Sequence, residues 1–97
     1  MFSSLLIDAI CESLRDTLGP DVLKILVSKG LLDNSDHPRE FDGQLRSIFG
    51  DGARVLERVV TNELCRKLGI PYVTSVPFDY GKAVTAARDA FSTIVKG

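Results

Sequence analysis

The fold is decided by the stretch at residues 49–69, which reads FGDGARVLERVVTNELCRKLG. Apolar side chains recur through it every three or four residues, the spacing that places them on one stripe of an α-helix. A glycine stands at either end, and Asp51 is placed to cap the first turn. We therefore predict a central helix over residues 52–68. Its core-facing side chains are expected to be Val55, Leu56, Val59, Val60 and Leu64.

Outward from this stretch, the same periodicity predicts four more helices. Gly19 and Pro20 separate the first two, because glycine ends a helix easily and proline fits the first turn of the next. Residues 31–37 form a polar loop, and two prolines disfavour helix over residues 70–77. The chain is therefore predicted to be all-α, a single domain over residues 1–97 with a compact bundle of about five helices. The expected helices are 4–18, 20–29, 38–49, 52–68 and 79–96.

Local signals add detail to this scheme. Ser3 or Ser4 is expected to cap the first helix, Asp36 the third and Asp79 the last, because their oxygens accept from free first-turn amides. Glu63 and Lys67 stand four residues apart in the order that favours an ion pair on a helix. The segment at residues 70–77 is expected to lie over the core as a linker, anchored by Tyr72 and Val76.

Composition limits the classes of function. The chain has 97 residues, of which 44% are hydrophobic, and its net charge is −1. It contains no apolar run long enough for a membrane helix, and its start lacks the basic region of a signal peptide. We therefore expect a cytoplasmic protein. A nucleic-acid partner is disfavoured, because such proteins usually carry a strongly basic balance.

Residues that could support catalysis or metal binding are few. His37 is the one histidine, and it precedes Pro38 in a polar loop where a solvated or capping role is expected. Cys11 and Cys65 are expected to be small buried hydrophobes, with a disulfide between them as the alternative. The acidic loop from Asp33 fails the EF-hand pattern at its sixth and twelfth positions. We predict no catalytic residue, no metal site and no cofactor, and hence no enzyme.

DNA binding is one alternative. The glycine-containing junction between the helices at 38–49 and 52–68 is compatible with a helix-turn-helix. Arg54 and Arg58 would then lie near the start of a recognition helix. The nearby acids Asp51 and Glu57 and the overall charge argue against it.

Protein interaction is the leading expectation. The helix at 4–18 has a wider apolar face than one neighbour requires, and spare apolar surface on a small domain often marks a partner contact. We therefore predict a self-associating module that forms a homodimer or binds a protein partner. Its contact surface is expected to include Phe2, Leu5, Leu31 and Leu32. A third hypothesis is small-ligand binding in a core cavity lined by Phe41, Phe49 and Phe91.

One resemblance can be added. The run LRSIFGDGARVLE at residues 45–57, continuing through Glu63-Leu64 to Lys67-Leu68-Gly69, resembles the Nitrosopumilus output domain, a small archaeal all-helical family. The similarity covers residues 45–69 and consists of apolar periodicity and a Phe-Gly-x-Gly-Ala junction. It implies a signalling or regulatory output role in an archaeal cytoplasm, with no catalytic residues to transfer.

Overall fold

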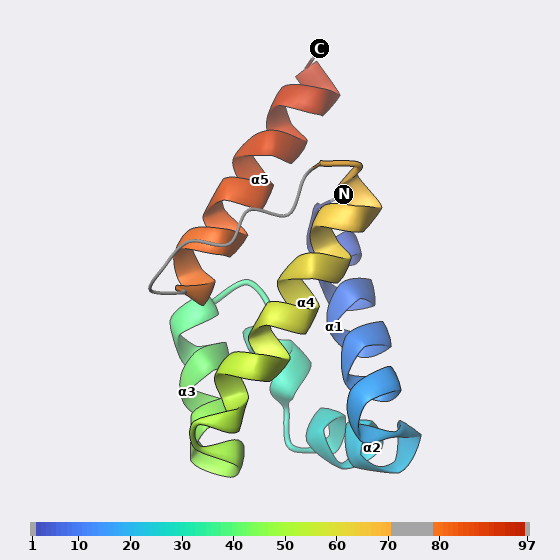
Figure 1. Ribbon diagram of the computed structural model, residues 1–97, viewed down its shortest axis with the longest axis vertical. Helices are drawn as coiled ribbons and strands as arrows, with labels where there is room; N and C mark the ends of the chain where they lie inside the picture. The colour runs from blue at the N-terminus through green and yellow to red at the C-terminus, as the bar shows by residue number, and fades with distance from the viewer. Residues whose placement is uncertain (1, 71–78, 97) are drawn as a thin grey trace.

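The computed structural model describes residues 2–70 and 79–96 of the chain (Figure 1). This part of the chain contains five α-helices, one 3-10 turn and no strand. Its elements are α1 (Phe2–Leu18), α2 (Pro20–Ser28), η1 (Leu31–Asn34), α3 (Pro38–Phe49), α4 (Gly52–Leu68) and α5 (Tyr80–Lys96). The predicted all-α bundle is confirmed, and the boundaries of the long helices agree to within two residues.

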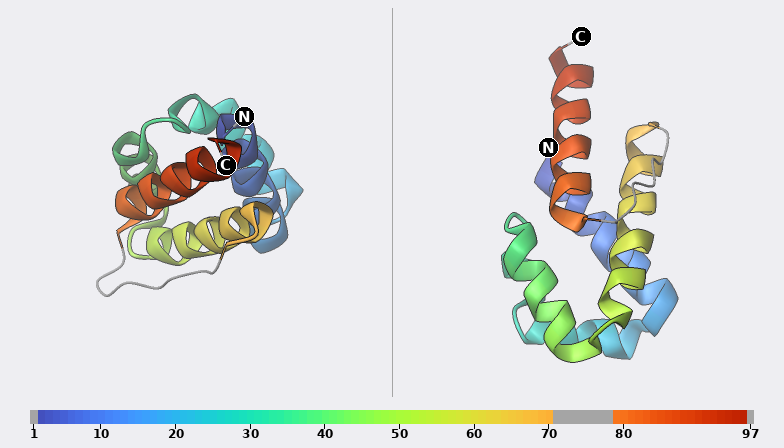
Figure 2. Two further views of the ribbon diagram at one scale, coloured as in Figure 1. Left: turned by 90° about the horizontal axis from the view of Figure 1, so that it is seen from above. Right: turned by 60° about the vertical axis from the view of Figure 1, so that its left-hand side comes forward.

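Helix α4 occupies the centre of the arrangement, as the sequence predicts. It packs against α1, α3 and α5, while α2 and η1 lead from the lower end of α1 to the upper end of α3 (Figure 1). The last turns of α5 project beyond the other helices (Figure 2). The polar loop expected at 31–37 is partly ordered as η1, which places Leu31 in the core.

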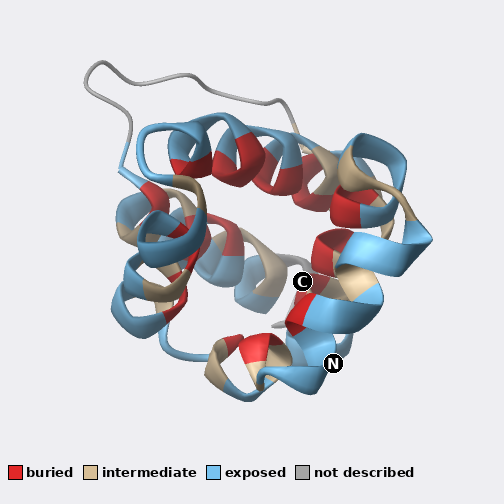
Figure 3. Cartoon of the chain, turned by 90° about the horizontal axis from the view of Figure 1, so that it is seen from below, coloured by how far each residue is buried: buried red, intermediate tan, exposed pale blue. Residues whose placement is uncertain are grey.

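The core is formed by the inward faces of these helices (Figure 3). Its apolar members come from every element except the loops, so no pair of helices could bury them alone. The completely buried side chains include Leu6, Ile10 and Leu14 of α1, Phe41 and Leu45 of α3, and Val60 and Leu64 of α4.

Two expected helix caps are wrong, and two lie at the predicted position, one of them with a capping hydrogen bond. Helix α1 begins at Phe2, so Ser3 lies inside it and donates instead to Asp36 Oδ1 at 3.0 Å. The N-cap of α3 is His37, not Asp36, and its side chain makes no capping bond. Asp51 does occupy the N-cap position of α4, also without a capping bond. Asp79 caps α5 as predicted, because its Oδ1 accepts from the Lys82 amide at 3.0 Å.

The predicted inward face of α4 is wrong at two positions. Val55 is 61% exposed and Val59 is 36% exposed. The face that packs against the core runs through Leu56, Val60 and Leu64 and continues on the other side into Glu57. The buried stripe of α4 is therefore rotated away from Val55 and Val59 relative to the predicted one. Glu57 lies on the buried side in place of these valines.

The structure also bears on the predicted ion pair of α4 and on the two cysteines. Lys67 pairs with Glu12 of α1 at 2.9 Å, whereas Glu63 pairs with Arg66, so the predicted Glu63–Lys67 pair is replaced by a bridge between helices. Both cysteines are free. The linker residues Tyr72 and Val76 lie outside the described residues.

None of the described helices combines the length and apolar content that crossing a membrane requires.

Candidate functional site: a polar cleft between three helices

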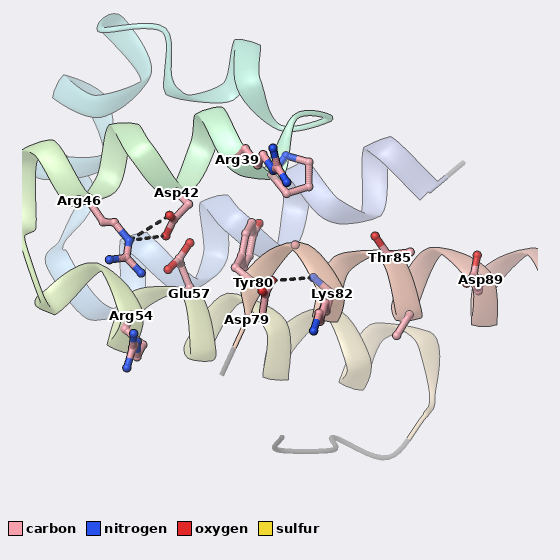
Figure 4. Close-up of a pocket in the computed structure, with 13 residues that line it drawn as sticks. Arg39, Asp42, Arg46, Arg54, Glu57, Asp79, Tyr80, Lys82, Thr85 and Asp89 are labelled. Atoms are coloured by element: carbon pink, nitrogen blue, oxygen red, sulfur yellow. Dashed lines mark hydrogen bonds and ion pairs between the residues drawn. The ribbon is translucent and has the colours of Figure 1, made fainter. Parts of the chain in front are cut away.

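An open cleft of about 730 Å³ lies between α3, α4 and α5 (Figure 4). Pockets that bind small ligands commonly have volumes of about 300–1,000 Å³, so this size suits a small molecule. Most of the residues that line it have charged or polar side chains. The lining side chains with titratable groups are Arg39, Asp42 and Arg46 from α3, Arg54 and Glu57 from α4, and Asp79, Tyr80, Lys82 and Asp89 at and along α5.

Glu57 is the buried carboxyl group of this cleft. It is 2% exposed, and it points from α4 toward α3 (Figure 4). Its pKa is raised to about 8, chiefly by burial and also by a hydrogen bond to Asp42 and the charge of Asp42, while Arg46 and Arg54 oppose the shift. The carboxyl is therefore neutral at pH 7, and its single proton is donated to the Asp42 carboxylate. Its other oxygen, Oε2, has no hydrogen-bond partner.

Asp42 is held in place by Arg46, one turn further along α3. The Arg46 Nε donates to both carboxylate oxygens of Asp42, at 2.9 and 3.0 Å. The Asp42 charge beside Glu57 favours the protonated form of Glu57. The cluster therefore contains one carboxylate and one neutral carboxylic acid.

Tyr80 is the second buried polar group. It is 4% exposed, and its ring stacks on Phe41 with the ring centroids 5.2 Å apart. Its hydroxyl is buried without a hydrogen-bond partner. Burial, with a smaller contribution from Glu57, raises the pKa of the phenol well above its usual value, so the hydroxyl keeps its proton. The Asp79 cap fixes Tyr80 as the first residue of α5.

Three cationic side chains around the cleft are exposed and could bind an anionic ligand group. Arg39, Arg54 and Lys82 are exposed and line the cleft, and within residues 2–70 and 79–93 they make no ion pair. A smaller depression of about 270 Å³ adjoins it at Arg46 and Arg54. The cleft thus combines exposed positive charge at its edge with two buried, neutral polar groups inside.

The residues predicted from sequence are distributed over several places. Arg54 lines the cleft, whereas Arg58 is exposed on α4 outside it. DNA binding through these two arginines stays a prediction.

The predicted contact surface is wrong for its buried members. Phe2 is 8% exposed and Leu31 is fully buried, because both pack into the core. Leu5 and Leu32 are half-buried against the same core. These four side chains therefore pack into or against the core of the bundle.

The aromatic residues proposed for a core cavity do not line the cleft. Phe41 lies beneath Tyr80, and Phe49 and Phe91 pack against the core. Sequence reasoning missed Glu57 and Tyr80 as a site. One signal was present, since Glu57 lies three residues before Val60 and seven before Leu64, in phase with the buried stripe.

The described residues contain no group of histidine, cysteine or acidic side chains arranged to hold a metal ion. Comparison of the chain with family models, with curated proteins and with solved structures found no match. The resemblance of residues 45–69 to the output-domain family therefore stays a prediction.

Proposed function

We propose that the protein is a non-enzymatic binding module that holds a small polar ligand in the cleft between α3, α4 and α5. The observation that carries this proposal is the pair of buried polar atoms, Glu57 Oε2 and Tyr80 Oη, that lack hydrogen-bond partners. Leaving such a group unpaired costs about 1–3 kcal/mol, and buried polar groups are nearly always paired. A ligand with hydroxyl or amine groups would supply the missing partners.

The wider role proposed for this module is regulatory. A ligand that contacts α3, α4 and α5 together would hold the three helices in one arrangement, since it stabilises the state that binds it. A cytoplasmic, signalling-output role, as implied by the resemblance described above, is consistent with a binding site of this kind and is part of the proposal.

The test fills the cleft and asks whether binding disappears. Thr85 lines the cleft and is exposed, so Thr85→Trp introduces a bulky ring there without disturbing the core. Thr17 is an exposed threonine on α1 outside the cleft, and Thr17→Trp is the matched control.

The readout is the set of amide shifts in ¹⁵N-labelled protein exposed to mixtures of anionic, neutral and cationic small molecules. We expect shifts concentrated on cleft residues of the wild type and of Thr17→Trp, and their loss in Thr85→Trp. If no mixture shifts the cleft amides, or if Thr85→Trp responds like the control, the proposal is refuted.

Self-association is a second candidate, and exposed apolar side chains favour it. Ile25 on α2 is 55% exposed, Val55 on α4 is 61% exposed and Ile48 on α3 is 42% exposed. Light scattering after size exclusion tests it directly. We expect a dimer that Val55→Glu dissociates and that Asn62→Glu, at an exposed polar position of the same helix, leaves intact. A wild-type monomer at all concentrations would refute this second candidate.

A further inference from the structure

The first turns of two helices meet at one end of the cleft. Pro38 begins α3 and Gly81 is the second residue of α5, and a Cβ atom placed on Gly81 would lie 3.9 Å from Pro38 Cβ. The N-terminus of each helix carries free amide groups and the positive end of the helix dipole. Both ends line the same cleft, which therefore has a backbone potential suited to an anion.

Side chains add to this potential. Arg39 follows Pro38 in α3 and Lys82 follows Gly81 in α5, and both line the cleft. Each is exposed and makes no ion pair within the described part of the chain. A guanidinium and an ammonium placed this way can neutralise the charge of a bound oxyanion.

A buried proton donor lies in the same place. Tyr80, between Asp79 and Gly81, has a hydroxyl that is unpartnered and closed to solvent. The hydroxyl has a proton to donate, and a ligand reaches it once the side chains that cover it move aside. The Tyr80 side chain is 4% exposed and belongs to the first residue of α5, so this donor lies at the same helix end and lines the same cleft.

The acidic residues of the cleft leave room for an anion. Asp42 is engaged by Arg46, and Asp79 accepts from the Lys82 amide. Glu57 is neutral and adds no negative charge. Asp79 and Asp89 have no cationic partner within the described residues, since the Lys82 amide that Asp79 accepts from is neutral. The exposed cations Arg39, Arg54 and Lys82 outnumber these two acids, so the balance of charge in the cleft favours an anion.

We propose that the cleft binds a small oxyanion, a phosphate or a carboxylate group, at the joined first turns of α3 and α5. Arg39 and Lys82 act as its counter-ions, and the Tyr80 hydroxyl donates a hydrogen bond to it. The unpartnered Glu57 oxygen accepts from a hydroxyl group elsewhere on the ligand. This inference rests on the proposed function, since it names the chemical class of the ligand that the cleft takes.

Titration with defined probes tests it. Inorganic phosphate, pyrophosphate and citrate are added separately to ¹⁵N-labelled protein at low ionic strength, with spermidine as the cationic probe. Phosphate and pyrophosphate report a phosphoryl ligand, and citrate reports a carboxylate ligand. We expect saturable shifts at residues of the first turns of α3 and α5 with at least one anion, and none there with spermidine.

Matched charge variants show whether the proposed residues are responsible. Arg39→Gln/Lys82→Gln removes two charges from the cleft, and Arg15→Gln/Lys24→Gln removes two exposed charges from α1 and α2. We expect the first pair to weaken binding by at least about tenfold, the effect of losing a charge-assisted hydrogen bond. The second pair is expected to change it by less than about threefold, as distant exposed charges are screened. Equal loss in both variants would overturn the proposal.

Tyr80→Phe isolates the hydroxyl. It keeps the ring on Phe41 and removes a group that has no partner in the unliganded protein, so folding is preserved. We expect anion affinity to fall by about three- to tenfold. Unchanged anion affinity would contradict the proposed hydrogen bond from the Tyr80 hydroxyl to the anion. Spermidine bound in the cleft with no anion bound would refute the oxyanion and leave the proposed ligand-binding function standing.

Discussion

Replacing Glu57 with glutamine changes one buried group and keeps its shape. Glutamine retains a carbonyl oxygen, and its NH₂ group can donate to Asp42 in place of the acid proton. In the wild type, the Glu57 carboxyl has an ordinary pKa of 4.5 and a pKa of about 8 in the fold. Between these two values the unfolded chain releases a proton that the folded chain keeps.

The sign and size of the effect follow from this difference. A raised carboxyl pKa means that the folded state binds more protons than the unfolded state. The contribution of Glu57 to the free energy of unfolding is therefore greatest below pH 4.5 and is lost as pH rises toward 8. At pH 7, protonating a carboxyl whose unfolded pKa is 4.5 costs about 3 kcal/mol. Glu57→Gln removes that cost, so we expect it to stabilise the protein by up to about 3 kcal/mol at pH 7 and by nearly nothing at pH 4.

Urea unfolding followed by circular dichroism at pH 4, 5.5, 7 and 8 measures the effect. The matched control is Glu40→Gln, which changes an exposed glutamate on the same cleft-forming helix as Asp42. Its free energy of unfolding is expected to change by less than about 0.5 kcal/mol at every pH. If Glu57→Gln destabilises the protein at pH 7, Glu57 is an ionised partner of Arg46 or Arg54, and the neutral-acid description is wrong.

Three further predictions concern the elements that hold the cleft. Phe41→Ala is expected to lower the free energy of unfolding by about 3–5 kcal/mol in urea titrations, because it empties fully buried space beneath Tyr80; a loss below about 1 kcal/mol would contradict this packing. Asp79→Ala is expected to cost about 0.5–2 kcal/mol and to speed hydrogen exchange in the first turn of α5, and unchanged exchange would exclude the cap. Lys67→Met breaks the ion pair with Glu12 and is expected to cost less than about 1 kcal/mol, with the difference shrinking in high salt; a difference independent of salt would point to packing instead.

The helix boundaries could be predicted well from the sequence because the residues that begin and end each helix act locally. Gly19 and Gly69 end α1 and α4 with φ of 93° and 71°, values that glycine adopts without a side-chain clash. Pro20 and Pro38 begin α2 and α3, where the missing amide hydrogen is not needed. Signals of this kind do not depend on what each helix packs against, so they can be recognised before the fold is known.

The orientation of α4 could not be predicted so well. Val55 and Val59 extend the apolar pattern to one side of the helix, and Glu57 and Thr61 lie on the other. Hydrophobicity favours burying the valines, yet the structure buries Glu57 and Thr61 and exposes both valines. The difference arises because Glu57 is neutral and hydrogen-bonded beside Asp42, and these conditions exist only once α3 is packed against α4.

The candidate site depends on tertiary structure in the same way. The isolation of the Tyr80 hydroxyl depends on where Phe41 and the first turn of α3 lie. Asp42 and Glu57 are 15 residues apart, and no spacing rule for a single helix connects them. The sequence shows the charged residues, and the packing of three helices decides which of them meet.

One face of α5 packs into the core, and exposed residues on another face line the cleft. Tyr80, Val84 and Ala87 are buried and anchor the helix, whereas Lys82, Thr85 and Asp89 line the cleft from exposed positions. Because the second set contributes little to the core, these three positions can be exchanged together in a combinatorial library. The bundle therefore offers a small scaffold whose ligand preference could be reprogrammed along one face of one helix while the rest of the molecule stays fixed.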